Sequence, residues 1–130
     1  MVGPSGDRGV HVGDNGPLTD AVAKQISGAD ILMLPIDSDY HILKRDEIQA
    51  FRERLAPAIL IPMHYRHPDL ETEANSPDDL GELDTWLATE KSVRQLGSHT
   101  VTLSRDALPS TPQVLVFEHS PRVVPPSPAN

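Results

Sequence analysis

The fold of this 130-residue chain is constrained most by two short, uninterrupted apolar runs, Ile31–Ile36 and Ala58–Met63. Each run has the length of a β-strand and shows no alternation of polar and apolar residues. A strand of that kind is covered on both faces, which is typical of parallel sheets that lie between other layers. The two runs therefore predict a parallel sheet with covered faces.

The residues around these runs predict the neighbouring elements. Residues 9–13 alternate apolar with small or polar side chains and indicate a short strand. Thr19 can cap a helix that follows this strand, and Gly28 can end that helix. A second helix is predicted from about Lys44 to Ala56.

The predicted order is β-α-β-α-β, and right-handed crossovers make the sheet of this α/β fold mostly parallel. A short helix around Leu80–Leu87 and two late strands at His99–Leu103 and Gln113–Glu118 are predicted to follow. Three covered strands and two helices cannot cover both faces of the sheet, so the chain resembles half of a domain. An uncovered face favours self-association or a partner chain.

The predicted partial domain runs over residues 9–118, after a disordered start at residues 1–8. An acidic loop is expected at about residues 66–80, because seven carboxylates and no Lys or Arg lie between Asp69 and Asp84. The tail at residues 119–130 is rich in proline and is predicted to be disordered.

Composition excludes several classes of function. The 11 basic and 19 acidic residues give a net charge of −8, which argues against nucleic acid as a partner. The chain has no cysteine, which excludes a disulfide scaffold, a thiol nucleophile and a Cys-based metal site. No apolar run could span a bilayer and no signal peptide is visible, so we expect a cytoplasmic protein without a membrane partner. Any chemistry is left to His, Asp, Glu, Ser or a metal ion.

Two polar residues follow predicted strands directly. Asp14 comes after the strand at residues 9–13, and His64 comes after the strand at residues 58–63. Open α/β sheets bind ligands beyond the carboxyl ends of their strands, and the two side chains converge there if their strands are parallel neighbours. Both residue types are common ligands of zinc and similar ions. Alternatively, Asp14 makes an Asx turn and His64 caps a loop.

Four short motifs occur in order along the chain: the turn His11–Gly16, the apolar strand Ile31–Pro35, the step Tyr40–Ile42 and the strand end Ile61–Tyr65. Together they resemble the metallo-β-lactamase superfamily, in particular the ascorbate-6-phosphate lactonase type and related predicted zinc-dependent hydrolases. The resemblance covers residues 9–67 and 108–118. It implies the C-terminal half of a metallo-β-lactamase-like αβ/βα sandwich.

The resemblance also implies a metal site. Asp14 would be the carboxylate that bridges or closes a two-metal site, and His64 would be the last histidine ligand of the second metal. The implied cofactor is one or two zinc ions, and manganese or iron would suit the same ligands. The implied reaction is attack by a metal-bound hydroxide on an ester, lactone, amide or phosphoester of a small-molecule substrate.

The chain departs from the family in one important respect. It lacks the cluster His-x-His-x-Asp-His, and a further histidine, which the family carries before the residues matched here. A hydrolytic zinc site usually needs three protein ligands and a water, so Asp14 and His64 are only part of a site. We expect the isolated chain to be inactive, as a truncated member, a fragment of a longer product or half of an assembly. The alternative is a non-catalytic half-domain that binds a partner or itself.

Four further polar residues lie near predicted strand ends. Asp37, Asp39 and His41 belong to the loop that leaves the second strand. They could face a substrate or a metal, or they could form a polar loop that caps the next helix. His11 lies within the first strand, where it either orients a metal ligand or is a structural histidine.

Overall fold

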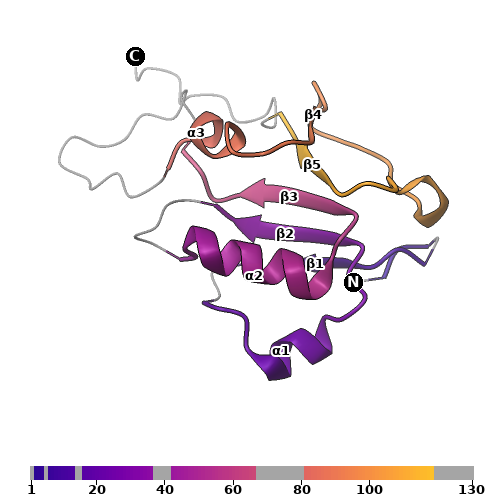
Figure 1. The fold of residues 1–130 in the computed structure, drawn as a ribbon. Coiled ribbons are helices and arrows are strands. Elements are labelled where there is room, and N and C mark those ends of the chain that lie inside the picture. Colours follow the sequence, from indigo (N-terminus) through magenta and orange to yellow (C-terminus); the bar gives the residue numbers. More distant parts are fainter. Residues whose placement is uncertain (1, 5, 14–15, 37–41, 67–80, 119–130) are drawn as a thin grey trace, which may run out of the picture.

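The computed structural model describes residues 2–4, 6–13, 16–36, 42–66 and 81–118. Its strands are β1 (Gly9–His11), β2 (Ile31–Pro35), β3 (Ile59–Met63), β4 (Val93–Gln95) and β5 (Gln113–Val116). Its helices are α1 (Asp20–Gln25), α2 (Arg45–Leu55) and α3 (Leu83–Leu87), with a 3-10 turn, η1, at Arg105–Ala107. The elements follow the predicted order, so the α/β fold class is confirmed (Figure 1).

The strands form one five-stranded sheet in the order β1-β2-β3-β5-β4, and each neighbouring pair is parallel. β3 is therefore the central strand of the described sheet. His11 lies beside Met33, and Met33 lies beside Ile61 in the register. Because parallel strands end at the same edge, the carboxyl ends of β1, β2 and β3 come together there.

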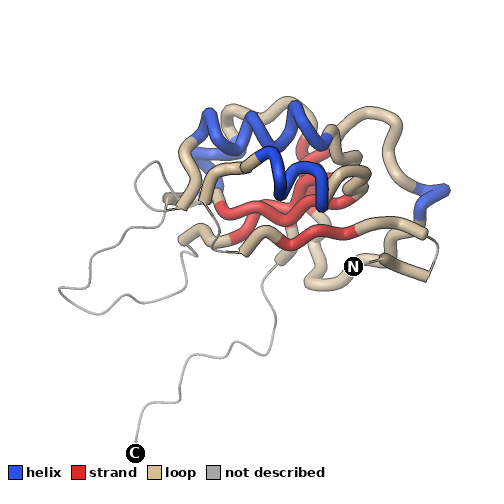
Figure 2. The backbone as a smooth tube through the Cα atoms, turned by 90° about the horizontal axis from the view of Figure 1, so that it is seen from below, coloured by secondary structure: helices blue, strands red, loops and turns tan. Residues whose placement is uncertain are grey.

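One face of the sheet packs against the helices, which Figure 2 shows on one side of the strands. Leu32, Leu34 and Leu60 lie on this face and are at most 4% exposed. They form one cluster with Phe51 of α2 and Trp86 of α3. Burial of one such side chain contributes about 1.5–3 kcal/mol, so this cluster is the main core.

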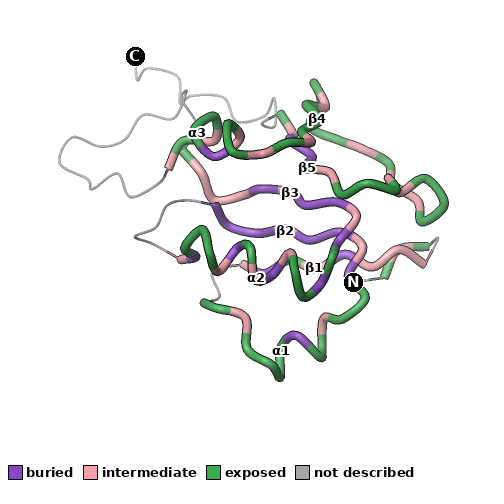
Figure 3. Tube along the Cα trace, in the orientation of Figure 1, coloured by how far each residue is buried: buried purple, intermediate pink, exposed green. Residues whose placement is uncertain are grey.

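The opposite face, called the second face below, carries a smaller and more open cluster. Ile31, Ile59 and Leu115 are buried in it. Around them lie half-buried apolar residues from β3, from the segment between β4 and β5, and from the position just after β5: Ile61, Leu96, Val101, Leu103, Leu108 and Phe117. Figure 3 shows the contrast between the buried strands β2 and β3 and the half-buried or exposed chain around η1. The second face is thus covered only in part.

The helix boundaries follow signals that the sequence carries. The Thr19 hydroxyl accepts a hydrogen bond of 3.3 Å from a backbone N–H in the first turn of α1. Gly28, just beyond α1, has a φ of 80°, which side chains disfavour. At the start of α2, the backbone N–H of Lys44 donates to Oε2 of Glu47 at 2.7 Å. These hydrogen bonds satisfy backbone N–H groups at the helix starts that have no partner within the helix.

The predicted strand at residues 99–103 is wrong. The first late strand, β4, lies earlier at Val93–Gln95, and its three residues are all exposed. Val101 and Leu103 instead pack against the cluster on the second face. Their alternation with polar residues therefore reflects this packing, not pairing in the sheet. The second late strand is confirmed as β5, which ends at Val116.

The start of the chain carries a defined contact. Within residues 1–8, for which we predicted disorder, an antiparallel bridge joins Val2 and Arg8. The Arg8 guanidinium also donates to the carbonyl oxygens of Gln25 and Ser27, at 2.7 Å each. Apart from residue 66, the predicted acidic loop lies outside the described residues, as does the tail at 119–130. In the described part, no helix has the length and apolar character needed to cross a membrane.

Candidate functional site

His64 follows β3 directly and so lies at the carboxyl end of the central strand. Its φ of 58° lies in the left-handed region, which is uncommon for residues other than glycine. The residue is half-buried, and its Nδ1 atom is enclosed by the protein. Backbone conformations of this kind cluster at functional sites, and this edge of an α/β sheet is where ligands bind. His64 is therefore the leading candidate for a ligand in the described part of the chain.

Two prolines lie at the strand ends beside His64. Pro35 is the last residue of β2 and pairs in register with Met63, and Pro62 precedes Met63 in β3. Proline has no N–H to donate to the ladder. The N–H of Ile36 donates instead to the carbonyl of Met63 at 2.9 Å, where the strands leave the sheet. This bond joins β2 to β3 at the edge of the sheet at which His64 lies.

The chain after β1 reaches the same edge. The N–H of Val12 donates to the carbonyl of Met33 at 3.1 Å, so this chain stays joined to β2 just before the predicted ligand position. Several of the predicted site residues lie outside the described residues, and their roles stay predictions: Asp14, Asp37, Asp39 and His41.

His11 is the last residue of β1 and is exposed. Because it lies beside Met33 in the register, alternation along the strands places it on the second face together with Ile61. That position is two residues short of the strand end of β2. Its predicted part in orienting a metal ligand stays a prediction.

The described residues do not make up a metal site by themselves. Among them, no group of three or more His, Asp or Glu side chains could hold a metal ion. Of the two predicted ligands, His64 is described and Asp14 is not. A hydrolytic zinc site needs about three protein ligands, so the described residues fit the contribution of one ligand to such a site.

Two features of the chain that leaves β3 had no signal in the sequence. Arg66 donates its backbone N–H to the carbonyl of Gly81 at 3.0 Å and forms a bridge with Glu82. Tyr65 packs against the main core, and burial raises the pKa of its phenol above the usual 10.0. The Arg66 contacts join residues that are distant in the sequence, which a local pattern cannot reveal.

Comparison with known proteins finds a matching family model and similar solved structures. Residues 5–64 match the family model described as the Beta-lactamase superfamily domain. A crystal structure from Thermotoga maritima, assigned to the Zn-dependent hydrolases of the metallo-beta-lactamase superfamily, is similar with a TM-score of 0.71 and 26% sequence identity. The similarity covers 89% of this chain and 55% of that chain, so the chain spans little more than half the length of its neighbour. No curated protein matches the chain.

Proposed function

We propose that this chain, whose resemblance to the metallo-β-lactamase superfamily is confirmed in sequence and in fold, supplies part of the metal site of a hydrolase. The observation that carries the proposal is the position of His64. It ends the central strand in a left-handed backbone conformation and is the last residue of the match to the family model. Asp14, which follows β1, is the second ligand in the proposal.

A metal ion in such a site acts as a Lewis acid and activates water for attack on an ester, lactone, amide or phosphoester bond. Zinc is the metal that we propose first, because the name of the structural neighbour includes it. Manganese and iron accept the same His and Asp ligands. The role of this chain in the proposal is to hold His64 at a fixed position on the sheet edge. The proposed substrate is a small molecule.

We infer that the remaining ligands come from polypeptide outside these 130 residues. Asp14 and His64 alone fall short of the three protein ligands that a hydrolytic zinc site usually has. The neighbour supports this inference, because the similarity covers only 55% of its chain. The isolated chain is then inactive as a hydrolase. A cytoplasmic location is part of the proposal.

Metal stoichiometry and oligomeric state, measured on one sample, test this proposal. After equilibration with zinc and removal of free ion, we expect retained metal only where an assembly completes the site. Asp14 and His64 of the isolated chain should bind added zinc only weakly and release it when the free ion is removed. Hydrolytic turnover by a zinc-loaded monomer would contradict the partial site. An assembly that holds no zinc, manganese or iron would contradict the dependence on metal.

A second candidate function is the docking of another polypeptide on the second face of the sheet. The observation that favours it is the open cluster around Ile31, Ile59 and Leu115, whose apolar neighbours stay half-buried. Large apolar patches that remain accessible mark interaction sites. The occupant that we propose is the polypeptide that completes the metal site, since the neighbour extends well beyond the matched part.

Sedimentation tests this second candidate. The chain is mixed with the part of the Thermotoga maritima neighbour that the structural similarity does not cover. Ile61→Asp places a charge on the second face and should abolish the complex. Val22→Asp is the matched control, because Val22 is exposed on α1, on the other side of the sheet. If the chain instead forms a homodimer that Ile61→Asp disrupts, the occupant of the second face is a second copy of the chain and not the proposed polypeptide. The absence of any complex would contradict docking.

A further inference from the structure

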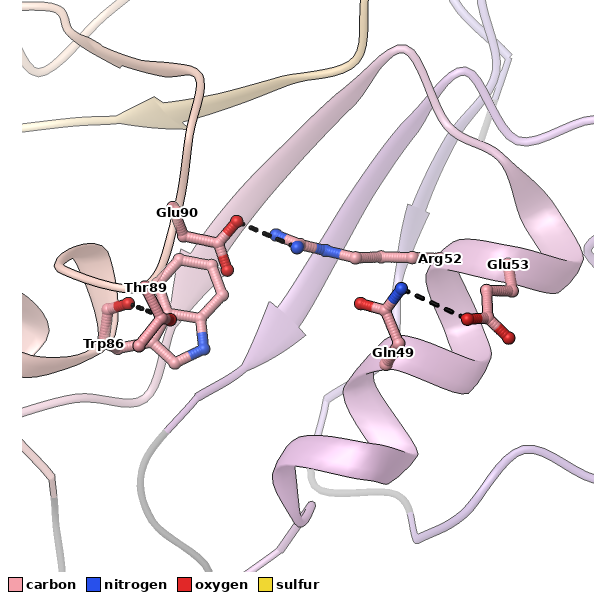
Figure 4. Close-up of polar contacts among 6 residues, drawn as sticks. All are labelled: Gln49, Arg52, Glu53, Trp86, Thr89 and Glu90. Atoms are coloured by element: carbon pink, nitrogen blue, oxygen red, sulfur yellow. Dashed lines mark hydrogen bonds and ion pairs between the residues drawn. The ribbon is translucent and has the colours of Figure 1, made fainter.

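Arg52 of α2 makes two contacts with the chain around α3 (Figure 4). Its Nη1 atom forms an ion pair with Oε2 of Glu90 at 2.8 Å. Its guanidinium carbon also lies 5.5 Å from the centre of the Trp86 ring, within the range of a cation–π contact. One side chain on α2 thus holds both α3 and the residue that leads from α3 toward β4.

These contacts are more enclosed than an ordinary surface ion pair. The side chains of Arg52 and Glu90 are 25% and 12% exposed, and Trp86 is 6% exposed. On the same helix, Arg54 pairs with Asp20 at 2.6 Å, but those side chains are 45% and 88% exposed. Exposed pairs contribute little, whereas loss of one partner from an enclosed pair leaves the other charge poorly solvated. The two arginines therefore form a natural comparison.

The chain around α3 is joined in turn to the residues that follow His64. The N–H of Trp86 donates to the carbonyl of Glu82 at 3.4 Å within the first turn of α3. Glu82 forms a parallel bridge with Arg66, and the N–H of Arg66 donates to the carbonyl of Gly81 at 3.0 Å. A continuous series of contacts thus runs from Arg52 through α3 to the second residue after His64.

We propose that Arg52 is a positioning residue for His64. β3 fixes the backbone before His64, and the bridge at Arg66 fixes the backbone after it. By fixing α3 against α2, Arg52 keeps that bridge in place and so maintains the left-handed backbone of His64. The consequence for metal binding rests on the proposed function, whereas the positioning itself does not.

NMR of the metal-free chain tests the positioning directly, with Arg52→Ala compared with Arg54→Ala. In Arg52→Ala we expect the ring signals of His64 to shift, and the amide of Arg66 to exchange with solvent at least about tenfold faster. Arg54→Ala should change neither. Arg52→Lys keeps the charge opposite Glu90 and should restore the His64 signals in part. Glu90→Gln preserves the shape of that side chain and gives the same test if Arg52→Ala fails to fold.

The proposal would be overturned if the His64 signals and the Arg66 exchange rate in Arg52→Ala stay as in wild type. If Arg52→Ala fails to fold, the same result in Glu90→Gln would overturn it. Equal changes in the Arg52 and Arg54 variants would also overturn it, because they would reflect a general loss of stability. A failure of the proposed function looks different. In that case the His64 signals respond to Arg52→Ala as expected, but they do not respond to added zinc.

Discussion

The backbone N–H of Ile36 donates to the carbonyl oxygen of Met63 at 2.9 Å, and this bond joins β2 to β3 where the strands leave the sheet. His64 is the next residue and turns into the left-handed region, with a φ of 58°. The direction in which His64 leaves the sheet is therefore set by a strand that pairs with β2 along its whole length and with β5 at its start. Sites built on strands are held more accurately than sites built on loops, which suits a metal ligand.

The unequal covering of the two faces predicts unequal costs of truncation at neighbouring positions of β3. Leu60→Ala removes a side chain that is 4% exposed in the main core, and should lower the free energy of unfolding by about 2–5 kcal/mol. Ile61→Ala removes a half-buried side chain from the second face and should cost about half as much or less. Urea unfolding of both variants measures the two losses. Equal losses would contradict the partial covering of the second face.

The left-handed backbone at Gly28 predicts a cost for any side chain there. Gly28 has a φ of 80°, and a Cβ at this position would meet nothing closer than Nη1 of Arg8 at 3.9 Å. The cost of Gly28→Ala thus comes from the backbone and should be about 1–2 kcal/mol. Gly16→Ala is the control, because a Cβ there would meet no atom within 4 Å. Thermal unfolding should show a lower Tm for the Gly28 variant only, and equal Tm values would contradict this account.

The raised pKa of Tyr65 predicts a loss of stability at alkaline pH. Burial raises the pKa of this phenol above 10.0, so the folded chain keeps the proton at a pH at which the unfolded chain loses it. Above about pH 10 the unfolded state binds fewer protons, and the free energy of unfolding falls as the pH rises. The fall ends once the folded chain also deprotonates. Below about pH 10 the phenol is protonated in both states and does not make the free energy of unfolding depend on pH. Denaturant unfolding of wild type and Tyr65→Phe across this range should show a shallower decline in the variant. The same slope in both would contradict the prediction.

Much of the sheet could be predicted from the sequence because its central strands are defined by burial. The runs that became β2 and β3 are apolar without interruption, since each strand is covered on one face by helices and in part on the other. β4 could not be predicted in the same way. The three residues of Val93–Gln95 are exposed, and the strand exists because its backbone pairs with β5. The apolar alternation at residues 99–103 was misleading because it serves packing on the second face.

The candidate site was predictable only where it depends on local sequence. His64 could be placed because a recognisable strand and a short motif precede it. Its left-handed backbone could not be predicted, because histidine adopts that conformation more often than most residues but still uncommonly. The contact between Arg52 and Glu90 joins two elements that are far apart in the chain, so only the folded structure reveals it.

Zinc titration of the chain, followed by NMR at the rings of its histidines, tests most directly whether His64 is a metal ligand. We expect the His64 signals to shift with added zinc, and those of the exposed His99 to stay unchanged. His64→Ala and Asp14→Ala should each weaken zinc binding by at least about tenfold while the chain stays folded, and His99→Ala should not. The same zinc affinity in the His64 and Asp14 variants as in wild type would contradict the assignment of the site.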